Sequence, residues 1–332
     1  MERKELYRYI GNSEQLYGIR RVILDEGNAR GIAVYEVKTA CGLELEILPD
    51  TGLDIGHLSY KGVNISYTTK NGYDSPARFQ PMPGNFGRYF PGGMLYTCGL
   101  LSAGPENTDT KDGGFQPLHG RIHGQSARGV FGYIDGENIV AGGELIETEQ
   151  NGSNFSLRRK YTIPVWGSEL TIEDEITNLR PEPMEYMMLY HMNFGYPMLS
   201  ESAELELPEA RKVTPRTPYA ERGLSKHCEF SEPIDGEEEQ VYFHEMDSEL
   251  LASAVLKNPE LGLRAEVSWS LGTLPILAEW KNMKSGDYVL GLEPSSCFIM
   301  GRERERREGR LKMVEGFGTV KNCVKLSVSE VK

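Results

Sequence analysis

Apolar and charged side chains alternate with a period of two residues in several short segments of this chain. In Leu43–Leu48, leucine or isoleucine stands at alternate positions with glutamate between them, and a similar alternation returns in Leu170–Ile176 and Val324–Val328. A period of two directs successive side chains to opposite faces of a β-strand, one toward a core and the other toward water. A helical period occurs only within residues 1–20 and 247–256. The pattern therefore predicts an all-β protein.

Glycines separate many of the predicted strands. Glycine makes up 37 of the 332 residues, about 11%, where about 7% is usual. Between Arg20 and Tyr67, glycine-containing turns interrupt the strand pattern about every ten residues, which is typical of an antiparallel meander. The length and the number of strands fit two large antiparallel sheets packed face to face. No linker or repeat divides the chain, so we expect one domain over residues 1–332, with a short N-terminal extension at about 1–20.

The charge balance excludes several classes of partner. The chain has 36 Lys and Arg against 49 Asp and Glu, a formal net charge of -13, which is the wrong sign for binding nucleic acid or an anionic membrane. The polar N-terminal residues do not resemble a secretory signal, and no run approaches the length of a membrane span, so we expect a cytoplasmic protein. The cysteines are odd in number, widely spaced and without a C-x-x-C pair, so they predict neither a disulfide framework nor a thiolate metal site.

Residues 71–124 are rich in proline, glycine and aromatic residues, and they predict a long structured loop rather than regular strands. Loops of this length are usually functional. The segment PLHGRIHG at 117–124 carries His119 and His123, and the glycines beside them leave both imidazoles accessible to a ligand.

Two further polar residues stand at the ends of apolar strands. His191 lies toward the end of the apolar run MEYMMLYHMNF, which is followed by Gly-Tyr-Pro. Glu293 ends the run YVLGLE, and Pro294 stops the strand ladder directly after it. Both runs predict buried strands that deliver a polar group at one end.

Three short motifs connect these residues: Leu118-His119-Gly120, then His191-Met192-Asn193-Phe194, then Leu292-Glu293-Pro294. Together they resemble the aldose 1-epimerase (galactose mutarotase) family, in which Leu-His-Gly-Gly, Asn-His-x-Tyr-Phe-Asn and Leu-Glu-(Thr or Pro)-Gln occur in this order at comparable spacing. The resemblance extends over most of the chain. Arg121, Tyr190 and Ser295 depart from the family motifs, so the chain looks more like the less characterised bacterial branch of the family.

The resemblance implies a galactose mutarotase-like β-supersandwich that interconverts the α and β anomers of a monosaccharide or a close derivative. It implies that His119 binds the sugar, that His191 is the general acid at the ring oxygen, and that Glu293 is the general base at the anomeric hydroxyl. The chemistry itself requires such a pair, because opening a cyclic hemiacetal removes a proton from the C1 hydroxyl and gives one to the ring oxygen. We therefore expect a small-molecule sugar as the partner, with no cofactor and no metal.

The remaining candidates are neighbours of these three residues. The resemblance relates the early Gly-Arg element of the family to Gly87-Arg88, with Arg78 as the alternative, and Arg121, His123 and Asn193 are further candidates for substrate binding. His227 and His244 flank an acidic, loop-like stretch, and we expect them to be solvated. The charged run at 301–310 is largely self-neutralised, either as a strand or as a helix with ion pairs.

Two other functions remain open at this point. A metal-dependent sugar isomerase could use His119, His123, His191 and Glu293 as nitrogen and oxygen ligands for zinc or manganese. A non-catalytic carbohydrate-binding protein could keep the pocket without turnover. The identity of the sugar and the oligomeric state do not follow from the sequence.

Overall fold

The computed structural model describes residues 3–109, 111, 114–246 and 250–331. Twelve strands of this described part form one large sheet. Ten of them follow one another side by side, in the order β1 (Gly18–Ile23), β2 (Ala33–Lys38), β3 (Leu43–Leu48), β4 (Asp54–Tyr60), β6 (Leu95–Leu100), β13 (Met184–Phe194), β20 (Val289–Ser295), β19 (Ile276–Asn282), β16 (Gln240–Met246) and β15 (Ala210–Pro215). The other two are β5 (Val63–Asn64), which pairs with β4, and β21 (Lys312–Val314), which pairs with β13.

A second sheet lies against the first and has eight strands in the described chain. Their order is β14 (Glu204–Glu206), β17 (Leu251–Asn258), β18 (Leu263–Ser270), β22 (Thr319–Glu330), β12 (Glu169–Asn178), β11 (Asn154–Pro164), β10 (Asn138–Thr148) and β9 (Arg128–Asp135). A small hairpin joins β7 (Asn107–Asp109) to β8 (Gly114–Gln116). The strand pairs of all three sheets are antiparallel, which confirms the predicted all-β fold of large antiparallel sheets.

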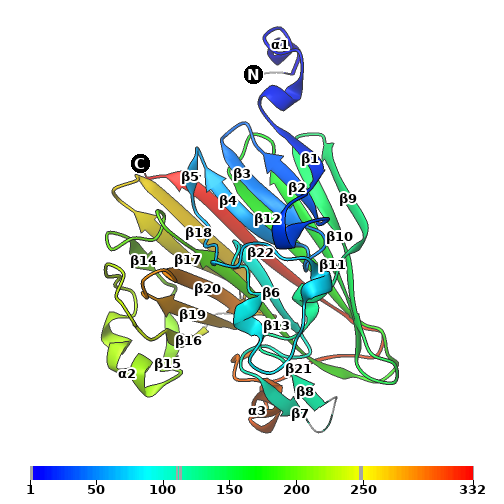
Figure 1. The fold of residues 1–332 in the computed structure, drawn as a ribbon, viewed down its shortest axis with the longest axis vertical. Coiled ribbons are helices and arrows are strands. Elements are labelled where there is room, and N and C mark those ends of the chain that lie inside the picture. Colours follow the sequence, from blue (N-terminus) through cyan, green and yellow to red (C-terminus); the bar gives the residue numbers. More distant parts are fainter. Residues whose placement is uncertain (1–2, 110, 112–113, 247–249, 332) are drawn as a thin grey trace.

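Helices are short and lie outside the sheets (Figure 1). The α-helices are α1 (Arg3–Leu6), α2 (Pro218–Gly223) and α3 (Arg302–Arg307). The 3-10 helices are η1 (Ser13–Gln15), η2 (Gly27–Ala29), η3 (Pro76–Arg78), η4 (Phe86–Arg88), η5 (Ile122–Gly124) and η6 (Leu224–Lys226). Among the described residues, none of the helices has the length and apolar character that crossing a membrane requires.

Burial follows the predicted alternation. Side chains of β18 alternate between buried and part-buried positions. Those of β12 alternate between buried positions and part-buried or exposed ones. This is expected for strands with one face in a core. One hydrophobic cluster draws residues from both sheets, so it fills the space between them. The single domain over residues 1–332 stays a prediction, which this shared core supports.

A fully buried arginine joins the two sheets through polar contacts. Arg159, on β11, forms two hydrogen bonds with the carboxylate of Asp174 on β12, at 2.9 and 2.7 Å. Its Nη1 also donates to the hydroxyl of Thr97 on β6 at 2.7 Å and lies 3.4 Å from a carboxylate oxygen of Asp54 on β4. The guanidinium therefore links four strands across the interface between the sheets.

Two sequence-based expectations need correction. The helical period at 247–256 does not produce a helix from Leu251 on, because that part of the segment pairs with β18 as strand β17; residues 247–249 lie outside the described residues. The charged run at 301–310 contains α3, and it is not simply self-neutralised. Its buried Arg302 pairs with the buried Asp109 at 2.9 Å, so tertiary contacts determine part of its charge pairing.

Candidate active site

The central strands β13 and β20 are buried along nearly their whole length, which indicates that both faces of the first sheet are covered here. Tyr190, Met192 and Leu292 belong to the core between the sheets. Because side chains alternate along a strand, His191 and Glu293 point to the opposite face. That face carries a second apolar cluster that includes Leu189 and Phe90.

A cavity of about 380 Å³ opens on this second face, a volume within the range of roughly 300–1,000 Å³ that is usual for small-molecule sites. His119, His191 and Glu293 all line it. Its aromatic wall contains Phe86, Phe90 and Trp280. The structure thus brings together the three residues that the motifs predict to act together.

His191 and Glu293 face one another across the two central strands. The register that pairs Leu189 with Ser295 and Met192 with Leu292 places them at directly opposite positions. Nε2 of His191 lies 3.2 Å from Oε1 of Glu293. Their exposed fractions are 5% and 1%. Nδ1 of His191 and Oε1 of Glu293 have no hydrogen-bond partner among the described residues, so both groups keep bonding capacity inside the cavity.

Burial controls the protonation of this pair. Loss of solvation lowers the pKa of His191 to about 4, and the side chain of the nearby Asn193 only partly opposes the change. Loss of solvation also raises the pKa of Glu293 well above its usual value; the nearby Arg216 opposes this rise and Glu239 adds to it. The two shifts therefore favour a protonated carboxyl group next to a neutral imidazole.

His119 lies beside this pair. Its ring centre is 5.3 Å from that of His191 and 5.4 Å from that of Phe86. Its Nδ1 accepts a hydrogen bond from the backbone N–H of Gly104 at 3.4 Å, so a neutral ring carries its proton on Nε2. Loss of solvation lowers the pKa of His119 well below its usual value, and repulsion from His191 and Arg216 adds to the effect. A neutral donor of this kind suits a sugar hydroxyl.

A glycine fixes the backbone that presents His119. Gly120 has a φ of 81°, and a Cβ at this position would lie 2.3 Å from the carbonyl oxygen of Gly99 and 2.4 Å from that of Ser102. Gly129 has a similar φ of 58° but open space around its Cα. We expect Gly120→Ala to lower the free energy of unfolding by roughly 1–3 kcal/mol more than Gly129→Ala does, because only the first adds a steric clash to the backbone strain. Urea unfolding of both variants measures the difference, and equal losses would contradict this reading of the turn.

The structure does not bring the other predicted substrate-binding residues into the cavity wall. Arg88 is exposed on η4. The guanidinium of Arg121 donates instead to Gln116 and to the backbone oxygen of Phe115, at 3.1 and 2.8 Å. These local partners hold its side chain, and Arg121 does not line the cavity.

His123 and Asn193 also have structural partners. His123 stacks on Tyr96, with ring centres 4.0 Å apart, and its Nδ1 lies 2.7 Å from Asp54. Asn193 is fully buried, and its amide donates to the backbone oxygens of Gly93 and His191 at 3.0 and 3.1 Å. Asn193 therefore positions His191. His123 does not line the cavity with His119, His191 and Glu293, and these four do not form a cluster of possible metal ligands among the described residues.

Four charged residues at the cavity were not found by sequence reasoning. They are Lys70, Arg216, Glu239 and Asp287. They form two ion pairs: Lys70 contacts Asp287 at 2.6 Å, and Arg216 contacts Glu239. Glu239 also accepts a hydrogen bond from Nε1 of Trp280 at 2.8 Å, which fixes the indole beside His191. Local sequence gives no signal for these pairs, because their members come from separate segments.

Comparison with known proteins places the chain in a family. A profile described as a domain of unknown function (DUF4432) matches residues 29–328. The chain belongs to the DUF4432 family. None of the curated proteins matches this member of the family.

Solved structures are similar to this DUF4432 protein over almost its whole length. A candidate aldose 1-epimerase from Klebsiella pneumoniae has a TM-score of 0.90 and 22% identity, covering 96% of this chain and 87% of its own. A galactose mutarotase-like protein from Clostridium acetobutylicum has a TM-score of 0.67 and 16% identity, covering 96% of this chain and 100% of its own. A galactose 1-epimerase from Lactobacillus acidophilus has a TM-score of 0.63 and 13% identity, covering 95% and 100%. The predicted galactose mutarotase-like β-supersandwich is confirmed.

Proposed function

We propose that the protein is a carbohydrate epimerase that interconverts the α and β anomers of a monosaccharide or a close derivative. The observation that carries this proposal is the buried pair His191 and Glu293, whose side chains meet at 3.2 Å in a cavity of sugar-binding size. The fold shared with a galactose 1-epimerase supports it. We infer the activity from the residues of this site, because one fold can serve many functions.

In the proposed reaction, one member of the pair removes the proton of the C1 hydroxyl while the other gives a proton to the ring oxygen. The bond between C1 and the ring oxygen breaks, and C1 becomes an aldehyde carbon. After rotation about the C1–C2 bond, the same two groups return the protons and the ring closes with either configuration at C1. We assign Glu293 to the anomeric hydroxyl and His191 to the ring oxygen. This assignment requires the proton of the Glu293 carboxyl group to pass first to Nε2 of His191, 3.2 Å away. Glu293 then takes the C1 proton as His191 gives its own to the ring oxygen, ring closure reverses both transfers, and the proton returns from His191 to Glu293.

The surrounding residues hold the sugar. His119 donates from Nε2 to a sugar hydroxyl, and Trp280 and Phe90 offer apolar surface to a C–H face of the ring. Polarimetry of freshly dissolved single anomers tests the function across aldoses, deoxysugars, uronic acids and sugar phosphates. An accelerated return to equilibrium for at least one sugar class is expected. Binding of a sugar without any acceleration would favour the non-catalytic carbohydrate-binding protein instead.

The pH profile of the reaction follows from the burial of the pair. Below a pH of about 4, His191 becomes protonated while the carboxyl group of Glu293 keeps its own proton, so the pair lacks a base. Above the raised pKa of Glu293, the pair has lost its only proton and lacks an acid. We expect kcat/KM to show a bell with its acid limb near pH 4, since this parameter reports the free enzyme. An acid limb near the ordinary histidine pKa of about 6.5 would contradict the proposed protonation.

The charge of the cavity predicts a preference for uncharged sugars. Both cations at its wall, Lys70 and Arg216, are ion-paired, with Asp287 and Glu239. A phosphate or carboxylate on the sugar would meet these carboxylates without a free cation to offset them, and like-charge contact is costly. We expect kcat/KM for a free aldose to exceed that for its phosphate by at least about tenfold. A higher value for the phosphorylated sugar would show that Arg216 or Lys70 leaves its partner for the substrate.

A further inference from the structure

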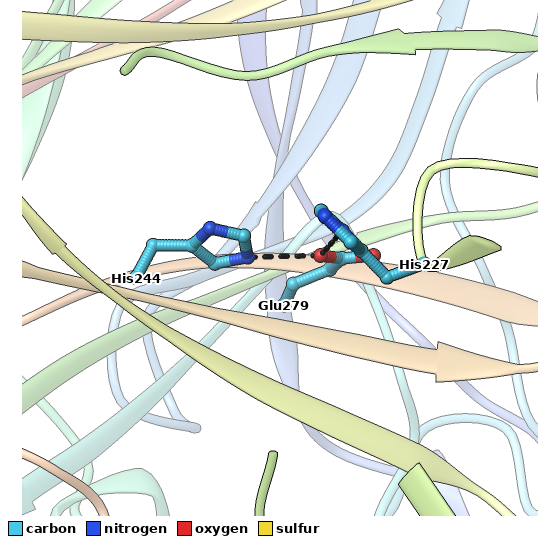
Figure 2. A group of neighbouring side chains, drawn as sticks. All are labelled: His227, His244 and Glu279. Carbon is cyan, nitrogen blue, oxygen red and sulfur yellow. Dashed lines mark hydrogen bonds and ion pairs between the residues drawn. The ribbon is translucent and has the colours of Figure 1, made fainter. Parts of the chain in front are cut away.

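Figure 2 shows a second cluster of titratable side chains, none of which lines the cavity. His227 follows directly after η6, His244 lies on β16, and Glu279 lies on β19. Nδ1 of His227 lies 2.8 Å from Oε2 of Glu279, and Nε2 of His244 lies 2.9 Å from the same oxygen. The expectation that both histidines are solvated is wrong, because His244 is 1% exposed and His227 is partly buried.

The cluster is separate from the proposed active site. His244 pairs with Leu277 in the register of β16 and β19, so its side chain shares a face of the sheet with Leu277 and Glu279. Glu293 pairs with Ala278, and it therefore points to the other face. The reaction proposed above uses none of these three cluster residues.

The buried position of the Glu279 carboxylate favours the binding of a cation beside it. The side chain is fully buried, and two imidazoles converge on one of its oxygens. Its other oxygen, Oε1, has no hydrogen-bond partner in the part of the chain that the structure describes. A buried carboxylate is costly unless it is paired and hydrogen-bonded, or bound to a metal. Oε1 of Glu279 can therefore still accept a hydrogen bond or bind a metal ion.

We propose that His227, His244 and Glu279 form a binding site for a divalent transition-metal ion, with Zn²⁺ as the best fit. Two imidazole nitrogens and one carboxylate oxygen are a donor set that zinc takes in proteins. The hard cations Mg²⁺ and Ca²⁺ prefer all-oxygen sites. These three ligands leave the fourth position of a tetrahedral zinc ion for a water molecule.

The geometry requires only a small adjustment. One ligand atom from each of the three residues lies within 4.8 Å of the others. A tetrahedral zinc ion with bonds of about 2.0–2.2 Å sets its ligand atoms about 3.4 Å apart. The imidazole nitrogens, now at 2.8 and 2.9 Å from Oε2, would move outward by about half an ångström to admit the ion.

The bound ion would hold a segment that borders the active site. Residues 216–239 leave the sheet after β15 and return at β16. Arg216 and Glu239, at the two ends of this segment, both line the cavity and pair with each other. His227 lies between them, so an ion at the cluster would tie the segment to β16 and β19. The role we infer for the metal is structural.

Metal binding to the purified full chain tests this site without any activity assay. Protein freed of metal with a chelator is titrated with Zn²⁺ and, separately, with Co²⁺, whose visible absorption reports coordination by protein ligands. Bound metal per chain is then measured after gel filtration. The variants are His227→Ala, at the partly exposed ligand, and Glu279→Gln, which keeps the shape of the buried side chain. The matched control is His57→Ala, on β4 away from the cluster.

We expect one bound ion per chain in the wild type and in His57→Ala, and an affinity at least about tenfold lower in both ligand variants. Circular dichroism checks that each variant is folded, and His227→Ala decides the question if Glu279→Gln does not fold. A wild type that binds neither Zn²⁺ nor Co²⁺ would overturn the site. Binding that is unchanged in folded His227→Ala would overturn it as well. These outcomes do not depend on the proposed epimerase activity.

Discussion

Glu293→Gln is expected to lower the rate of anomer exchange by about 10²- to 10⁴-fold, the usual contribution of one general acid-base group. The amide keeps the size of the side chain but can neither release nor accept the transferred proton. Glu293 is 1% exposed and lies 3.2 Å from His191, the other member of the proposed pair. Sugar binding should persist, so the loss should appear in kcat rather than in KM.

Glu147→Gln is the matched control for this prediction. Glu147 is also a buried glutamate, and loss of solvation raises its pKa to about 7. It accepts a hydrogen bond from the backbone N–H of Leu100 and does not line the cavity. Turnover of Glu147→Gln should stay close to that of the wild type. A folded Glu293→Gln variant with wild-type kcat would remove Glu293 from the mechanism.

Arg159→Met is expected to lower the free energy of unfolding by about 3–5 kcal/mol, the usual cost of removing one partner from a buried ion pair. The substitution would leave the carboxylates of Asp174 and Asp54 buried without their cation. The hydroxyl of Tyr190, which donates to Asp174 at 2.7 Å, offsets only part of this charge. Urea unfolding followed by circular dichroism measures the loss.

Arg158→Met supplies the comparison, because Arg158 is the preceding residue on the same strand and its side chain is 67% exposed. An exposed ion pair contributes little, so this variant should differ from the wild type by less than about 1 kcal/mol. Equal stability of the two variants would mean that the buried network between the sheets does not stabilise the fold. A loss confined to Arg159→Met would support the link that Arg159 forms across the interface.

The strand pattern and three short motifs were sufficient to predict the fold and the central residues of the candidate site. Alternation in segments such as Leu43–Leu48 reports which face of a strand is buried, and this information is local. His191 and Glu293 could be paired because the motifs that carry them resemble one family in type and order. The structure brings them together at directly opposite positions of neighbouring strands.

The rest of the site depends on tertiary contacts that local patterns do not encode. Arg121 lies beside a predicted motif, but two residues of the preceding strand β8 supply its hydrogen-bond partners, and it does not line the cavity. His227 and His244 flank an acidic stretch, and their partner Glu279 is 52 and 35 residues away in the sequence. The direction of a long side chain and the burial of an isolated histidine are decided by such distant partners.

NMR exchange spectroscopy of an aldose at anomeric equilibrium, with and without the purified protein, tests the proposed function most directly. If the His191–Glu293 pair transfers the two protons, the exchange rate between the α and β signals will rise in proportion to protein concentration. The rise will be lost in Glu293→Gln and kept in Glu147→Gln. Exchange that stays at the solution rate for every sugar that binds the folded wild-type protein would contradict the proposal.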